Sequence, residues 1–316
     1  MTRPPEGMNL APNGSRPAAR AYGSMLTAPH ALAAQSGLAV LMDGGNAADA
    51  IVAVAASLAV LYPHMTGIGG DVFFLYYDAA RGEVVGYNGS GAAAAAATID
   101  HYHERKLDTI PERGGAAALT VPGTIDAWFA LHERFGSIDM KRILAPAIAF
   151  AHDGAPAARS FVAAVVRLRD QLAADEGAAD LYVEHGPRRV GERFVNRQLA
   201  SSLRAIADQG RAWLYEGEGA EHIERCCTSI GSPLRAVDLA KHRGIFTTPA
   251  AGAFYGSTSI TTPPNSQGIA AIIAQQTYEA YADLPVHGSL DDGSAARAHA
   301  GIEARRCQTH RRLIPD

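Results

Sequence analysis

Hydrophobic and small residues dominate positions 28–62, and their arrangement predicts two closely packed helices. Alanine, leucine and valine recur through this stretch, which Gly44 and Gly45 interrupt near its middle. A glycine just past a helix end favours the left-handed C-cap. Asn46 followed by Asp49 has the spacing of an N-terminal capping box, so the second helix is expected to begin there.

The stretch after these helices has the composition of a β-hairpin. Residues 72–77 are rich in β-branched and aromatic residues, residues 78–82 favour a turn, and residues 83–87 resume a strand. The loop 88–91 ends the hairpin. The alanine run at 92–97 favours a helix on intrinsic propensity.

The rest of the chain carries helical periodicity interrupted by one further strand. Residues 254–262 predict a strand that enters a turn at Pro263 and Pro264. The expected helices lie at about 123–134, 140–153, 158–174, 198–209 and 268–281. Strands flanked by helices place the chain in the α+β class.

Composition and charge exclude some classes of partner. The chain has 316 residues, 47% of them apolar, which allows a substantial core. A net charge of −4 gives no reason to expect a nucleic acid or an anionic membrane surface as partner. The longest apolar stretch, 50–62, is too short for a membrane span. Three cysteines, Cys226, Cys227 and Cys307, form neither a disulfide framework nor a metal pattern.

The N-terminal residues 1–21 differ from the rest in composition. They are rich in proline, glycine, asparagine and arginine and contain no apolar segment of the signal-peptide type. We expect a disordered lead over this range, and a cytoplasmic location because no export signal is found.

Four short motifs follow one another along the chain. They are YPHMTGIGGD at 62–71, VPGT at 121–124, LAPAI at 144–148 and PPNSQG at 263–268. In this order, they resemble the gamma-glutamyltransferase family of N-terminal-nucleophile hydrolases, with matches from about residue 22 to residue 275.

The resemblance implies a fold and a division of the chain. The family forms a four-layered α-β-β-α sandwich, in which residues 22–316 correspond to the large-subunit region with a helical subregion at about 123–245. This part of the sandwich is incomplete without the small subunit, which is the expected protein partner. Relatives carry an extended segment with proline where 92–97 lies, so helix and extended chain both remain open there.

The resemblance also implies a catalytic mechanism that this chain does not carry by itself. In the family, a proenzyme cuts itself before a threonine, whose freed α-amine, with a pKa of about 8, serves as the base for its own hydroxyl. The threonine lies in a Thr-Thr-His type of motif, which is absent here. We therefore expect no catalytic residue in this chain, and no metal or organic cofactor. A large-subunit portion, a non-catalytic truncated remnant and a partner chain remain alternatives.

The substrate loop departs from the glutathione-cleaving members. Those members carry an arginine in a D-G-R-E segment, which forms a bidentate clamp on the glutamyl α-carboxylate. The matching positions are Asn88-Gly89-Ser90-Gly91, so the neutral Ser90 replaces the arginine. This pattern is closer to the branch that resembles oxamate amidohydrolase, which implies a small amide as substrate. A conventional gamma-glutamyl transferase or glutathione hydrolase is the alternative.

Six residues are candidates for substrate binding, and each also has a purely structural interpretation. Ser90 is a hydrogen-bonding residue or a turn residue, because Asn88 occupies the position, two residues before the serine, at which a nucleophile elbow requires glycine. His64 lines the site or packs at a helix end. The turn at 265–267 lines the site or only reverses the chain. The candidates are Asn88, Ser90, His64, Asn265, Ser266 and Gln267.

Overall fold

The computed structural model describes residues 19–117, 119–282 and 295–310. At its centre are helices α1 (Ala31–Met42) and α2 (Ala47–Leu61), which pack against each other as the sequence predicts. The capping box is confirmed: Asn46 Oδ1 accepts hydrogen bonds from the next turn, and Asp49 Oδ2 accepts one from the Asn46 amide at 2.9 Å. Gly44, with a φ of 89°, ends α1 in the left-handed region.

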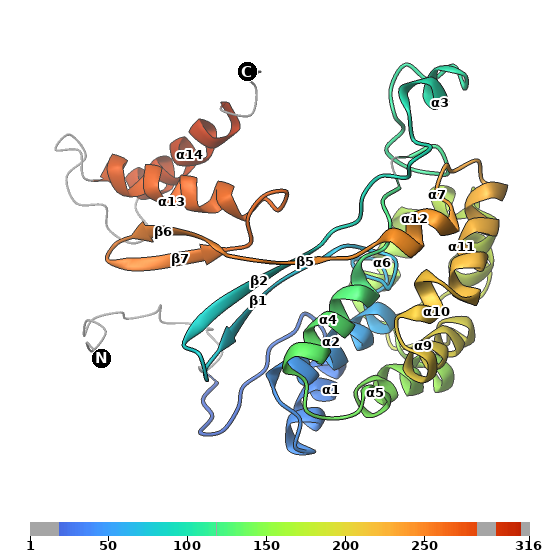
Figure 1. The fold of residues 1–316 in the computed structure, drawn as a ribbon, viewed down its shortest axis with the longest axis horizontal. Helices are drawn as coiled ribbons and strands as arrows, with labels where there is room; N and C mark the ends of the chain where they lie inside the picture. The colour runs from blue at the N-terminus through green and yellow to red at the C-terminus, as the bar shows by residue number, and fades with distance from the viewer. Residues whose placement is uncertain (1–18, 118, 283–294, 311–316) are drawn as a thin grey trace.

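The predicted hairpin is also confirmed. Strands β1 (Val72–Asp78) and β2 (Glu83–Gly89) pair antiparallel, and β5 (Ile245–Thr247) joins the free edge of β2. The inner face of this sheet carries Phe74 and Tyr87, whose rings stack 4.9 Å apart. Figure 1 shows the sheet running along the helices of the main body.

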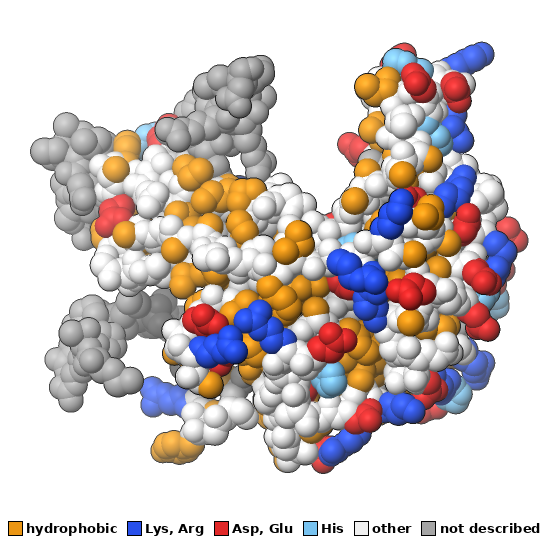
Figure 2. All heavy atoms as spheres, viewed as in Figure 1, with side chains coloured by type: hydrophobic (Ala, Val, Ile, Leu, Met, Phe, Trp, Pro, Cys, Tyr) orange, Lys and Arg blue, Asp and Glu red, His pale blue; other side chains and the backbone are white. Residues whose placement is uncertain are grey.

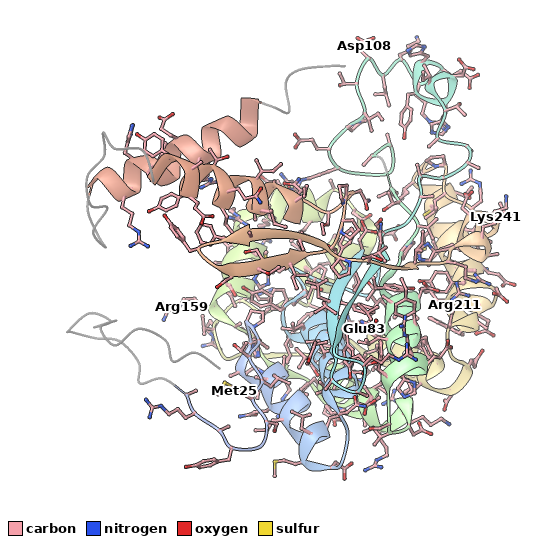
Figure 3. The ribbon with its side chains drawn as sticks, turned by 60° about the vertical axis from the view of Figure 1, so that its left-hand side comes forward. Met25, Glu83, Asp108, Arg159, Arg211 and Lys241 are labelled. Atoms are coloured by element: carbon pink, nitrogen blue, oxygen red, sulfur yellow. The ribbon has the colours of Figure 1, made fainter. Side chains whose placement is uncertain are left out.

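Helices α4 (Thr124–Phe135), α5 (Met140–Asp153) and α9 (Arg197–Gln209) enclose the main core with α2. Gly210, with a φ of 71°, ends α9 as predicted. The remaining elements of this body are α3 (Ile99–His103), β3 (Ala155–Pro156), α6 (Arg159–Arg167), α7 (Arg169–Ala173), α8 (Glu176–Ala178), the π-helix η1 (Ala179–Glu184), β4 (Arg193–Phe194), α10 (Ala212–Tyr215), α11 (Glu218–Ser229) and α12 (Ala236–Lys241). The segment around α3 projects from the body, with Asp108 near its outer end (Figure 3).

A second, smaller lobe follows β5 directly. It contains the hairpin of β6 (Ala250–Phe254) and β7 (Ser257–Thr261), which α13 (Gly268–Ala282) covers, and α14 (Ala295–His310), which packs against α13. In Figure 1 this lobe lies beyond the end of β5, on the opposite side from α9 to α12. The chain therefore forms a helical body and a C-terminal lobe joined through β5.

One open alternative is decided and two expectations need correction. The alanine run at 92–97 is not helical, because Ala93 bridges to Thr120 and tertiary pairing overrides propensity. The expected helix 158–174 is broken at Leu168 into α6 and α7. The expected strand 254–262 starts later, at Ser257 as β7, because a turn at Tyr255 separates it from Phe254, the last residue of the unpredicted strand β6.

Among the residues that the structure describes, no helix has the length and apolar character needed to cross a bilayer. Residues 1–18, most of the expected disordered lead, lie outside the described residues. The division into a lead and a large-subunit region with a helical subregion stays a prediction.

Candidate functional site

Two of the sequence motifs and the loop 88–91 meet at one point of the fold. The carbonyl oxygen of Gly70, in the glycine loop, accepts hydrogen bonds of 3.0 Å from the amides of Gly123 and Thr124 at the start of α4. The Thr124 hydroxyl also donates to this oxygen at 2.7 Å. Asp71 Oδ1 accepts a 3.1 Å bond from the amide of Gly91, just after β2. The glycine loop, the end of β2 and the VPG segment are thus held together.

Glycine is required at two of these positions because backbone lies where a side chain would be. A Cβ on Gly91 would lie 1.8 Å from the carbonyl oxygen of Val121, and one on Gly123 would lie 1.7 Å from that of Gly89. No side chain fits at either distance. The motif glycines therefore allow the backbone segments to approach each other closely.

A closed ring of three side-chain hydrogen bonds lies beside this junction. Asn88 Nδ2 donates to Asn265 Oδ1 at 2.9 Å, Asn265 Nδ2 donates to Ser90 Oγ at 2.9 Å, and Ser90 Oγ donates to Asn88 Oδ1 at 2.7 Å. The structure thus brings three of the six predicted site residues together, from the end of β2 and from the β7–α13 loop. We call these three residues the amide ring.

The amide ring is neutral and contains no base. Both hydrogen-bond partners of the Ser90 hydroxyl are carboxamides, which do not remove a proton from a hydroxyl group. This arrangement argues against Ser90 as a nucleophile. Asn88 and Ser90 are half-buried and Asn265 is exposed, so the ring has a surface on which a ligand can make neutral hydrogen bonds.

The other three candidates lie in different surroundings. Ser266 bonds within its own loop: its hydroxyl accepts from the Thr262 hydroxyl and donates to the Thr262 carbonyl. Gln267 is exposed at the start of α13. The His64 ring packs against Tyr62, with ring centres 4.2 Å apart. Their roles in substrate binding stay predictions.

Beneath the amide ring lies a buried acidic group that sequence reasoning missed. Asp126 on α4 is 5% exposed. Its Oδ2 accepts hydrogen bonds from the Tyr87 hydroxyl at 2.7 Å and from the Gly244 amide at 2.8 Å. Its Oδ1 accepts one from Arg211 Nε at 2.5 Å. Because Tyr87 precedes Asn88 on β2 and Gly244 precedes β5, Asp126 fixes both strands under the ring.

The electrostatics of this cluster keep Asp126 ionised. Burial by itself would raise its pKa, but the hydrogen bonds from Arg211, Tyr87 and Gly244 outweigh burial and hold the pKa below its ordinary value. Burial, together with the bond to Asp126, strongly raises the pKa of the Tyr87 hydroxyl. Burial also lowers the pKa of the nearby His242, whose Nε2 lies 3.8 Å from Asp126 Oδ2. The only sequence signal for this cluster is an acidic residue within a largely apolar helix.

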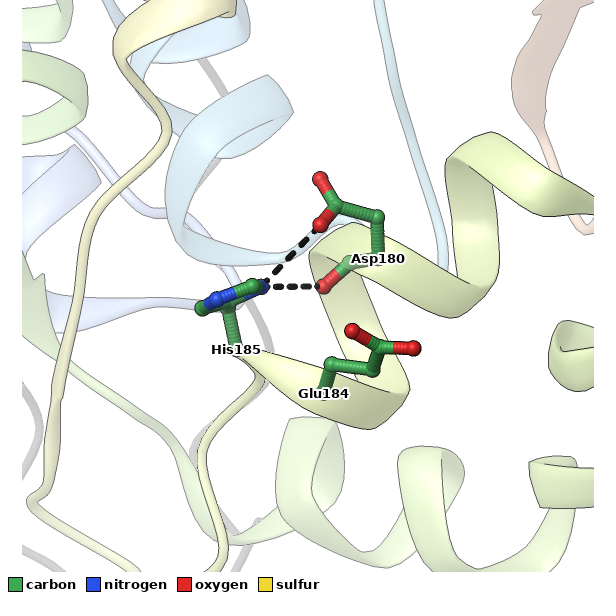
Figure 4. Close-up of side chains that lie close together, drawn as sticks. All are labelled: Asp180, Glu184 and His185. Carbon is green, nitrogen blue, oxygen red and sulfur yellow. Dashed lines mark hydrogen bonds and ion pairs between the residues drawn. The ribbon is translucent and has the colours of Figure 1, made fainter.

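One other side-chain cluster has groups that suit a metal ion. Asp180, Glu184 and His185 lie together on and just after the π-helix η1 (Figure 4). All three are exposed, and His185 Nδ1 already lies 2.9 Å from the Asp180 carbonyl oxygen and 3.2 Å from its carboxylate. Exposed acidic groups of this kind are common without a metal, so we assign no role to this cluster.

Comparison with known proteins identifies the family. The model of the gamma-glutamyltranspeptidase family matches residues 33–314, and the chain belongs to this family. It is 38% identical over 269 residues to the glutathione hydrolase-like YwrD proenzyme of Bacillus subtilis, covering 84% of this chain and 51% of that protein. It is 36% identical over 254 residues to the oxamate amidohydrolase proenzyme of Klebsiella pneumoniae, covering 78% of this chain and 48% of that protein. The chain thus spans about half the length of these curated relatives.

Solved structures agree with this assignment. The gamma-glutamyltranspeptidase of Helicobacter pylori matches with a TM-score of 0.86 and 27% identity, covering 94% of this chain and 85% of that chain. The gamma-glutamyltranspeptidase of Pseudomonas nitroreducens, in complex with L-DON, matches with a TM-score of 0.80 and 28% identity. The match covers 93% of this chain and 86% of that chain. The predicted α+β fold of the N-terminal-nucleophile hydrolase type is confirmed.

Proposed function

We propose that this chain is the large-subunit portion of an amide hydrolase or acyltransferase that acts on a small amide of the oxamate type. The catalytic threonine would come from the part of the relatives that this chain does not span. Two observations support the proposal: the family membership, and the similarity to an oxamate amidohydrolase proenzyme over 78% of the chain.

The observation that carries the substrate proposal is the amide ring. Ser90 occupies the position at which glutathione-cleaving members of the family are expected to carry the arginine clamp. Its hydrogen-bond partners are Asn88 and Asn265, both neutral, and the charged side chain that bonds to the neighbouring Gly91 amide is the carboxylate of Asp71. A glutamyl α-carboxylate would find no bidentate cation there. Oxamate also carries a carboxylate, but that group lies directly next to the scissile amide, so it would be bound by other groups of the assembled enzyme, while the neutral ring would hydrogen-bond to the amide.

The outer face of the sheet supports a partner subunit. Side chains of β1 alternate between the core and the outside, and Phe73, Leu75 and Tyr77 are 37%, 41% and 62% exposed on the outer face. Figure 2 shows hydrophobic side chains gathered over the middle of the molecule, where the sheet runs. An apolar sheet face of this kind is normally covered. We propose that the small subunit of the same family covers it.

A conventional glutathione hydrolase is the second candidate, and one observation favours it. The relative with 38% identity is described as glutathione hydrolase-like. In that case, a cation elsewhere in the assembled enzyme would bind the glutamyl carboxylate. A non-catalytic remnant is the third candidate.

Co-expression with the small-subunit portion of the Klebsiella relative, followed by purification of the complex, separates these candidates. The proposal predicts turnover of oxamate at a higher specificity constant than that for glutathione, and no turnover by the present chain alone. A complex that prefers glutathione would support the second candidate. A complex that forms but cleaves neither amide would support the remnant.

A further inference from the structure

An acidic side chain adjoins the amide ring without being part of it. Asp71 Oδ1 accepts a hydrogen bond of 3.1 Å from the amide of Gly91, which follows Ser90 directly in the chain. Standard bond lengths therefore place the Ser90 hydroxyl group within about 8 Å of this carboxylate oxygen. A ligand group that hydrogen-bonds to the ring at Ser90 lies within reach of the charge of Asp71.

The backbone on both sides of Asp71 is anchored. The carbonyl oxygen of Gly70 accepts hydrogen bonds from two amides and one hydroxyl group at the start of α4. Val72 pairs with Gly89 at the end of β2. The carboxylate itself is held by the Gly91 amide. Asp71 therefore presents its charge at a fixed place beside the ring.

The charge of Asp71 is not compensated within the described part of the chain. No lysine, arginine or histidine there forms an ion pair with its carboxylate. The carboxylate of Asp126, beneath the ring, is paired with Arg211. Burial lowers the pKa of His242, against the opposing effects of Asp126 and Asp71, so this imidazole is neutral at pH 7.

This charge acts on any group that approaches the ring from solvent, because Asp71 is exposed. Two negative charges about 8 Å apart repel each other enough to change an affinity about twofold in bulk water and about thirty-fold near a protein surface. The Debye length is about 10 Å at 0.1 M salt, so ordinary buffers leave much of the repulsion in place. A carboxylate is therefore repelled from the ring, whereas a carboxamide of the same shape is not.

We propose that Asp71 is a specificity-determining residue, whose negative charge excludes carboxylate groups from the amide ring and leaves the ring to an uncharged amide. This inference rests on the proposed function, because it takes the amide ring as the substrate surface. Ser90 offers a carboxylate no cation, and Asp71 adds a repulsive element against it. A substrate such as oxamate is thereby oriented with its amide toward the ring and its carboxylate away from it.

The test compares two ligands that differ in a single charge. Glutamate and isoglutamine share the α-amine and the γ-carboxylate, but isoglutamine has an α-carboxamide where glutamate has an α-carboxylate. Calorimetric titration of the complex with the Klebsiella small-subunit portion gives a dissociation constant for each ligand without any turnover. We expect isoglutamine to bind roughly tenfold more tightly than glutamate.

Asp71→Asn removes the charge and keeps a side-chain oxygen that can accept the Gly91 hydrogen bond. It should tighten the binding of glutamate roughly tenfold and leave that of isoglutamine within about twofold, whereas a purely structural role would change both alike. Asp170→Asn removes the same charge from an exposed position on α7 and is the matched control, which should change neither constant.

Salt gives a second measurement that needs no variant. Raising NaCl from about 0.05 M to about 1 M shortens the Debye length to about 3 Å, so the preference for isoglutamine should shrink in the wild type and stay constant in Asp71→Asn.

Four results would overturn the proposal: tighter or equal binding of glutamate in the wild type, no binding of isoglutamine, a preference that Asp71→Asn does not reduce, or one that salt does not reduce. Oxamate turnover by the same complex is measured separately. Turnover without the expected preference would reject the role of Asp71 alone. The expected preference without turnover would reject the proposed function alone.

Discussion

The side-chain amide of Asn88 donates a 2.9 Å hydrogen bond to the side-chain oxygen of Asn265, although 177 positions separate the two residues in sequence. Asn88 lies on β2 of the helical body, and Asn265 lies in the loop between β7 and α13 of the C-terminal lobe. The amide ring is therefore both the candidate substrate surface and a bridge between the two lobes.

This bridge predicts a local effect of Asn265→Ala. The substitution removes two of the three ring bonds, so β6 and β7 should exchange their amide hydrogens faster while the body stays protected. Global stability should fall by only about 1 kcal/mol, because the lost bonds are near the surface. Hydrogen exchange with mass spectrometry measures this directly. Gln267→Ala, an exposed neighbour in the same loop, is the control, and equal exchange in both variants would argue against a bridge.

A larger effect on stability is expected from Asp126→Ala. The substitution leaves Arg211, whose side chain is 18% exposed, with the half-exposed Glu216 at 3.5 Å as its remaining carboxylate, and removes the partner of the Tyr87 hydroxyl. Breaking a buried ion pair by deleting one member costs about 3–5 kcal/mol. Urea denaturation measures the loss. Asp208→Ala removes an ion pair with Lys141 in which both side chains are about 60% exposed, and should leave the denaturation midpoint nearly unchanged.

The same cluster predicts how stability depends on pH. The folded-state pKa of Asp126 lies below its ordinary value, so its contribution to stability is complete above the unfolded-state pKa of about 3.9 and is lost as the pH falls through the folded-state pKa. The pKa of His242 is also lowered, which means that the fold favours its neutral form. Stability should therefore already decline as the pH drops below about 6.5, where the unfolded chain binds this proton.

Two variants separate these contributions. His242→Phe should reduce the loss of stability between about pH 6.5 and about pH 5. Asp126→Asn should remove the further loss of stability that begins at about pH 4. Thermal melts at a series of pH values report both effects. If stability falls as steeply between about pH 6.5 and about pH 5 in His242→Phe as in the wild type, another histidine causes the fall.

The exposed sheet face predicts self-association of the chain without a partner subunit. Phe73, Leu75 and Tyr77 present an apolar strip on β1, and apolar strips drive association in water. Leu75→Lys should lower the sedimentation-average mass at a given concentration. Ile99→Lys, at a side chain that is 74% exposed on the projecting segment, is the matched control. Equal effects of the two substitutions would mean that the sheet face is not the contact.

Local signals in the sequence predicted the elements that depend on neighbours in the chain. The capping box at Asn46 and the hairpin at 72–87 are set within a few residues, and both were confirmed. The alanine run at 92–97 was ambiguous because its bridge to Thr120 is a tertiary contact. The break at Leu168 has no glycine or proline to mark it.

In the candidate site, too, the sequence predicted local features and missed those that join distant residues. The neutral Ser90, at the position where the family resemblance predicts an arginine, was visible in the sequence, and so were the glycines at 91 and 123. The closed ring was not, because it joins residues 177 positions apart. Asp126 was missed since its partners come from β2, the segment before β5 and Arg211, none of them near it in sequence.

The central claim is that the amide ring, with Ser90 in place of an arginine, disfavours a glutamyl substrate. In the complex with a relative's small subunit, the most direct measurement is the ratio of specificity constants for glutathione and oxamate in the wild type and in Ser90→Arg. Ser266→Arg, in the adjacent loop, controls for added charge.

A bidentate pair with a carboxylate is worth about 2 kcal/mol or more, which corresponds to a change of roughly thirty-fold in the specificity constant. We predict that Ser90→Arg raises the ratio by about that factor in favour of glutathione, and that Ser266→Arg leaves it within about twofold. A wild-type complex that already prefers glutathione, with a ratio that Ser90→Arg does not raise, would contradict the account.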